Sequence, residues 1–173
     1  MIYALGEQAP DIHPDAFVHP DAIVIGSVVL GAGASVWPAA AVLRGDYGRI
    51  EIGARTSIQD GTVVHTTGQW PTLIGAGCVV GHNVHVEGCT IGNGCLIGSG
   101  SVVLNEAVVE PGAAVGAAAL VPEGMVVPSG QIALGVPARL RPAPAELSTW
   151  VAEAVEIYLA GAARHRTDLR QIG

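Results

Sequence analysis

The residues with the clearest chemistry in this sequence are two histidines and a glutamate, His65, His82 and Glu87. Zinc takes imidazole nitrogens and carboxylate oxygens, and a catalytic zinc keeps three protein ligands and a fourth position open for water. These three side chains are therefore candidate metal ligands if the fold brings them together. His85 lies two residues before Glu87 and is an alternative ligand.

Polar side chains close to these ligands stand out because the chain is otherwise poor in charge. Only 13% of its 173 residues are charged, against about 25% in ordinary domains. The accompanying candidates for catalysis are Arg44, Asp46, Gln59 and Asp60.

A hexapeptide period predicts how the chain positions these groups. An aliphatic residue recurs about every six residues from Ile25 to Val121, often followed by glycine. This period fits neither a helix nor a long strand. Three six-residue units make one triangular coil, and stacked coils form a parallel β-helix. We therefore predict an all-β solenoid, with loops at two longer steps that contain residues 44–47 and 66–71.

A C-terminal helix is predicted after the repeat ends. Residues 145 to about 166 place apolar side chains on one helical side, and Pro144 suits a first helical turn. We expect this helix to pack along the solenoid and cover apolar surface. The predicted organisation is a β-helix over residues 1–140 and a helix with a tail over residues 141–173.

The repeat also predicts which side chains stack in neighbouring coils. If each long step counts as one unit plus a loop, Val42, Val64 and Val86 occupy one stack. His65 directly follows Val64 and Glu87 directly follows Val86. Their side chains should then be outward neighbours on adjacent strands, whose backbones lie about 4.8 Å apart.

Asp60 and His82 should stack in the same way on another face, beside Gln59. A single prism cannot easily direct two faces at one point, but two copies side by side can. In a cyclic trimer the first row of one subunit meets the second row of the next. The sequence therefore predicts a homotrimer with a site between subunits.

Several segments together carry a family resemblance, and they span about residues 10–140. They are Val36–Pro38, Arg44–Asp46, Ile52–Gly61, His65, Val80–His82, Gly88–Gly92 and Leu134–Arg139. With them the chain resembles the γ-class carbonic anhydrase-like branch of the hexapeptide-repeat proteins. The resemblance implies a left-handed β-helix, a homotrimer, and an interfacial zinc or iron whose bound hydroxide hydrates CO2 reversibly to bicarbonate.

The resemblance also assigns roles to individual residues. His65 and His82 match two metal-ligand histidines, and Glu87 stands where the family has a third. A carboxylate there adds negative charge, so the metal should be a weaker source of hydroxide at neutral pH. Gln59 matches a group that holds the metal-bound water, with Asp60 as its neighbour.

Arg44 and Asp46 match an ion pair that organises the trimer, with Asp46 pairing across subunits.

Two other functions stay open. Hexapeptide-repeat relatives include acyltransferases and CoA thioesterases, for which Arg139 and Arg141 are possible phosphate contacts. A non-catalytic trimeric metal-binding protein is the third hypothesis, and Glu87 favours it.

Charge and composition exclude other classes. The net charge is −7 and all eight basic residues are arginine, so nucleic acid is not an expected partner. The sequence has no apolar run of membrane-spanning length and no signal peptide at its start. We expect a cytoplasmic protein. Its three cysteines are odd in number and should be buried free thiols.

Overall fold

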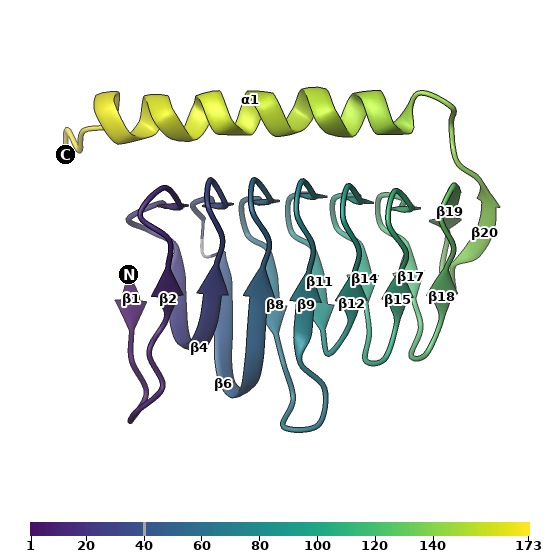
Figure 1. The fold of residues 1–173 in the computed structure, drawn as a ribbon, viewed down its shortest axis with the longest axis horizontal. Coiled ribbons are helices and arrows are strands. Elements are labelled where there is room, and N and C mark those ends of the chain that lie inside the picture. The colour runs from purple at the N-terminus through teal and green to yellow at the C-terminus, as the bar shows by residue number, and fades with distance from the viewer. Residues whose placement is uncertain (40) are drawn as a thin grey trace.

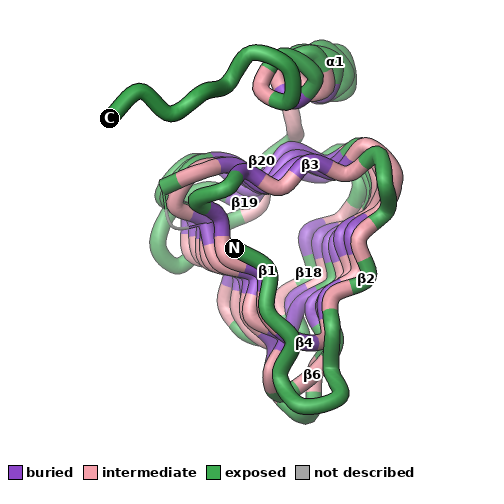
Figure 2. The backbone as a smooth tube through the Cα atoms, turned by 90° about the vertical axis from the view of Figure 1, so that its left-hand side faces the viewer, coloured by how far each residue is buried: buried purple, intermediate pink, exposed green. Residues whose placement is uncertain are grey.

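The chain forms a parallel β-solenoid of three faces with one long helix beside it, as a computed structural model describes for residues 1–39 and 41–173. Viewed along the axis, the coils make a triangle with the helix outside one side (Figure 2). The predicted all-β solenoid with a packed C-terminal helix is therefore confirmed.

Each face is a ladder of short parallel strands. The first face contains β8 (Val63–His65), β11 (His85–Glu87), β14 (Val102–Val103) and β17 (Leu120–Val121). The second face contains β9 (Thr72–Ile74), β12 (Thr90–Ile91), β15 (Val108–Val109) and β18 (Val126–Val127). The third contains β3 (Phe17–Val18), β5 (Ser35–Val36), β7 (Ser57–Ile58), β10 (Val79–Val80), β13 (Leu96–Ile97), β16 (Ala114–Val115), β19 (Gln131–Leu134) and β20 (Arg139–Pro142).

Two long strands join the first and second faces around one corner. They are β4 (Ile23–Leu30) and β6 (Val42–Ile52), and the short strands β1 (Ile2–Tyr3) and β2 (Asp11–Ile12) pair with β4. The pairing of β4 with β6 is interrupted by a bulge between Gly26 and Val28. The loop predicted at residues 44–47 is wrong for Arg44 and Gly45, which pair with Ile25 and Gly26 of β4. The additional residues of this long step lie between Gly45 and Ile50 of β6, opposite the bulge.

The hexapeptide aliphatics fill the interior, and the predicted register is wrong only in the first two coils. Val64 and Val86 are fully buried and aligned as predicted. In the first two coils, however, Val24 and Leu43 are buried, whereas Ile25 and Val42 face outward. Side chains alternate between the two sides of a strand, so counting from a long step misplaces this register by one residue.

The helix α1 (Leu147–Asp168) covers the outer side of the third face. It begins two residues later than predicted. Its buried side chains Leu147, Val151 and Val155 pack against Val79 and Ala114 of the solenoid. Burial of these apolar surfaces holds the helix in place, because each Å² of apolar surface removed from water contributes about 25 cal/mol of stabilising free energy.

The other end of α1 packs over Phe17 and Trp37. Arg55 and Glu156 add an ion pair between the solenoid and the helix. Among the described residues, no helix has both the length and the apolar character needed to cross a membrane.

Candidate functional site

His65 and Glu87 form the centre of a polar cluster on the first face. They are register partners in adjacent coils, so the predicted stacking is confirmed. Nδ1 of His65 lies 3.1 Å from Oε1 of Glu87. The side chains are 15% and 24% exposed, so the imidazole is held in a partly desolvated position.

A second carboxylate lies against the other nitrogen of His65. Oδ1 of Asp46 is 3.4 Å from Nε2 of His65, and both atoms are buried without a hydrogen-bond partner. Burial opposes ionisation of Asp46, but the hydrogen bond and charge of Arg44 outweigh it and lower the pKa of Asp46. His65 thus lies between two carboxylates.

Arg44 is the register partner of His65 on β6 and forms an ion pair with Asp46 of the same chain. Arg44 thus has an ion-pair partner within its own chain, and the predicted pairing of Asp46 across subunits is not required for this. The two residues lie two apart on one strand and project on the same side of it, which brings them together locally.

His82 and Asp60 meet at the corner between the third and first faces. Both follow strands of the third face by two residues, and those strands, β7 and β10, pair in register. Nδ1 of His82 lies 2.9 Å from Oδ2 of Asp60. The two side chains are 48% and 39% exposed. One nitrogen of His82 is thus oriented by a carboxylate.

Gln59 lies beside this corner but is 4% exposed. It occupies the outward row of the third face that also contains Trp37, as shown by the pairing of Val36 with Ile58. The family role of holding a metal-bound water stays a prediction for this buried amide.

His85, the alternative ligand, points to the same carboxylate as His65. Its Nε2 is 3.3 Å from Oε2 of Glu87. The two oxygens of Glu87 therefore each contact one imidazole. Sequence reasoning missed one aromatic neighbour: the ring of Tyr47 lies edge-on to His65 at 6.4 Å. Its place directly after the Arg-Gly-Asp segment was the available signal.

The predicted metal ligands do not all converge in one chain. Within residues 1–39 and 41–173, no three His, Cys, Asp or Glu side chains are grouped closely enough to hold a metal. His65 and Glu87 lie on the first face and His82 at the corner. The donor chemistry suits zinc, but the full ligand set requires a second copy of the chain.

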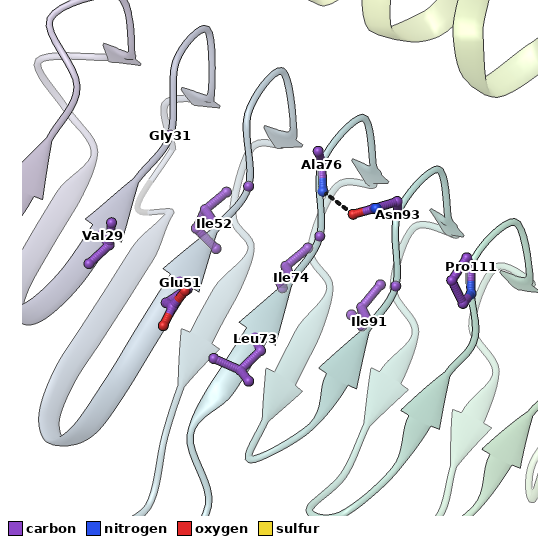
Figure 3. Close-up of a pocket in the computed structure, with 13 residues that line it drawn as sticks. Val29, Gly31, Glu51, Ile52, Leu73, Ile74, Ala76, Ile91, Asn93 and Pro111 are labelled. Carbon is purple, nitrogen blue, oxygen red and sulfur yellow. Dashed lines mark hydrogen bonds between the residues drawn. The ribbon is translucent and has the colours of Figure 1, made fainter.

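A groove of about 570 Å³ lies elsewhere, on the second face. Its outward side chains include Val29, Glu51 and Leu73, and Asn93 and Pro111 border it (Figure 3). None of the predicted site residues lines this groove, so it is separate from the cluster around His65.

Fold and repeat together define a left-handed β-helix of hexapeptide units. The model of the bacterial transferase hexapeptide family (six repeats) matches residues 71–105. A hexapeptide transferase family protein from Anaplasma phagocytophilum is 37% identical over 97% of this chain and 98% of its own, with a TM-score of 0.89. The chain therefore belongs to the hexapeptide transferase family.

Two other relatives carry more specific names. A Bacillus cereus protein solved as a candidate acetyltransferase is 32% identical, with 96% of both chains covered and a TM-score of 0.92. The carnitine operon protein CaiE of Escherichia fergusonii is 44% identical over 90 residues, which is 52% of this chain. The matched region spans 45% of that relative, about half its length.

Proposed function

We propose that the protein transfers acyl groups from a CoA thioester, with His82 as the general base. The observation that carries this proposal is the contact of 2.9 Å between Nδ1 of His82 and Oδ2 of Asp60. A carboxylate on Nδ1 fixes the tautomer and leaves the lone pair of Nε2 available, as in the histidines of acyl-transfer enzymes. Full-length similarity to a candidate acetyltransferase supports this function.

His82 acts on the acceptor in this mechanism. Its Nε2 takes the proton of an acceptor hydroxyl or amine while that group attacks the thioester carbonyl. The new bond to carbon forms, the carbon–sulfur bond breaks, and the leaving CoA thiolate takes the proton back from the imidazolium. Asp60 stabilises the imidazolium between these steps.

Arg139 and Arg141 are suitable contacts for the CoA phosphates. Both are exposed on β20. The corner row of His82 continues through two further coils, by the pairing of β10 with β13 and β13 with β16, and β19 follows. Four strand spacings of about 4.8 Å, across β13, β16, β19 and β20, separate the row of His82 from the strand that carries the two arginines, within the reach of an extended CoA molecule.

The proposed enzyme is a homotrimer, because the first face carries apolar side chains that this chain does not cover. The outward members of its rows include Ile23, Val42, Val63, Val102 and Leu120, all of them half-buried. The helix covers the corresponding apolar row of the third face. A second copy on the first face places its His82 corner beside His65 and Glu87.

The test measures CoA thiol release from acetyl-CoA, with a panel of amines and alcohols as acceptors. His82→Ala should lower kcat by about a hundredfold or more, and Asp60→Asn by a smaller factor. His13→Ala is the matched control, because His13 is exposed and distant from His82 in the sequence. The proposal is wrong if His82→Ala retains the full rate, or if the native protein releases no thiol with any acceptor.

CO2 hydration is the second candidate function, and a different observation favours it. The buried Nε2 of His65 has no hydrogen-bond partner, and Glu87 lies on the other side of the same ring, 3.1 Å from its Nδ1. His65 and Glu87 of one copy and His82 of the next would hold zinc or iron. Such a metal would supply Lewis acidity toward water, while Asp60 would orient the imidazole of His82 through its Nδ1. Metal analysis of protein purified without chelator tests this function, and metal-free protein that hydrates no CO2 after zinc addition excludes it.

A further inference from the structure

Two of the three cysteines lie in one inward row of the solenoid. Cys78 directly precedes β10 and Cys95 directly precedes β13, and these strands pair in register. Both thiols are completely buried in the main core. The backbone amide of Val79 donates to the carbonyl of Cys95, which fixes the two cysteines as neighbours in adjacent coils. Cys89, the third cysteine, lies at a different corner and is also buried.

The separation of these neighbours suits a disulfide. Adjacent parallel strands are about 4.8 Å apart, and disulfides join Cα atoms about 4.4–6.8 Å apart. From these two positions we propose that Cys78 and Cys95 are a peroxide-sensitive thiol pair that closes to a disulfide between coils. No step of the proposed catalytic functions uses them.

Each of the two thiols donates to a backbone carbonyl, and each influences the ionisation of the other. Sγ of Cys78 donates to the carbonyl oxygen of Gly92 at 3.0 Å, and Sγ of Cys95 donates to that of Glu110 at 3.2 Å. The neighbouring Cys95 lowers the pKa of Cys78, whereas the neighbouring Cys78 together with burial raises the pKa of Cys95. The thiolate is the nucleophile in cysteine oxidation.

Two grooves lie on either side of the corner that holds these cysteines. Gly77 and Gly94, which precede the two cysteines, line a groove of about 370 Å³ beside α1. Ala76, Gly92 and the labelled Asn93 line the groove of the second face on the other side of the same corner (Figure 3). Both cysteines are fully buried, so hydrogen peroxide reaches the thiols only when this corner opens locally.

The reaction consumes one peroxide. The Cys78 thiolate attacks one peroxide oxygen and the O–O bond breaks, which gives a Cys78 sulfenic acid and, after proton uptake, water. The Cys95 sulfur then attacks the Cys78 sulfur, the S–O bond breaks, and the second oxygen leaves as water with the thiol proton. The product joins the coil that carries His82 to the next coil.

The experiment treats the full chain with hydrogen peroxide, unfolds it in an alkylating agent and maps the peptides. The free thiols should fall from three to one, with the loss of two hydrogen atoms, a Cys78–Cys95 linked peptide and an alkylated Cys89. Relative to untreated protein, the midpoint of thermal unfolding should rise by several degrees, because a cross-link restricts the unfolded chain.

Variants separate this pair from general oxidation. Cys89→Ala should still form the link, and Cys95→Ala should not. Alanine should be tolerated at position 95, because the same buried row already contains two alanines. They are Ala34, two coils from Cys78, and Ala113, one coil from Cys95. The proposal is overturned if all three cysteines are alkylated after treatment, if Cys89 enters the link, if Cys78 gains oxygen without a link, or if the link joins two chains.

Discussion

Oε1 of Glu87 lies 3.1 Å from Nδ1 of His65, across one step of the solenoid. The other oxygen of Glu87 contacts His85. The carboxylate at the third ligand position is thus already engaged by two imidazoles of its own chain. Any metal at this position competes with those contacts, which weakens the case for CO2 hydration relative to acyl transfer.

Replacement of Glu87 tests the second function directly. Glu87→His should raise the metal content, because it supplies the third histidine that the family resemblance implies. It should also raise the CO2 hydration rate at pH 7, because one negative charge fewer makes metal-bound water more acidic. The native protein should be slow at pH 7 and faster at alkaline pH, and His85→Ala should have little effect. Metal analysis and stopped-flow hydration assays measure these quantities. Unchanged values of both in Glu87→His would contradict a metal role for this position.

The trimer can be tested by mass in solution. Light scattering should give about three times 17.5 kDa. Arg44→Ala should weaken assembly more than Arg170→Ala, because Arg44 lies on the first face beside Asp46 and Arg170 lies near the chain end. A monomer at micromolar concentration would contradict both the trimer and a site shared between copies.

Asp46 predicts a pH-dependent contribution to stability. Its folded pKa is lowered below the ordinary carboxyl value of 3.8. A lowered pKa contributes stability above the unfolded value, and that contribution is lost as pH falls through the folded value. The free energy of unfolding of Asp46→Asn should therefore fall below that of the native chain at pH 6 and approach it below about pH 4. Urea titrations at both pH values measure the difference, and a constant difference would contradict the assignment.

Close stacking of coils predicts unequal effects of two glycine substitutions. A methyl group at Gly53 would overlap the backbone of Gly75, whereas one at Gly77 meets nothing within 4 Å. Gly53→Ala should cost roughly 1–3 kcal/mol of unfolding free energy through overpacking. Gly77→Ala should cost about 1 kcal/mol, from its φ of +63° alone. Denaturant unfolding compares them, and equal costs would mean that the coils can separate locally.

The sequence alone determined the solenoid and the two stacked pairs of the candidate site. A period of six with glycine at the corners has one efficient way to bury its aliphatics, and counting along that period places His65 on Glu87 and Asp60 on His82. The partners of each pair are 22 residues apart, because both pairs span the long step at residues 64–74. Counting that step as one unit plus a loop gives the correct register.

Only the tertiary structure decided the parts that depend on the first long step, at residues 42–52, and on contacts between coils. The burial of Val24 and Leu43 and the pairing of Arg44 with Asp46 follow from the continuous pairing of β4 and β6. A shift of one residue there exchanges the inner and outer side chains, and the repeat does not encode that shift. The meeting of Cys78 and Cys95 likewise depends on inward side-chain direction in adjacent coils, which composition and spacing leave open.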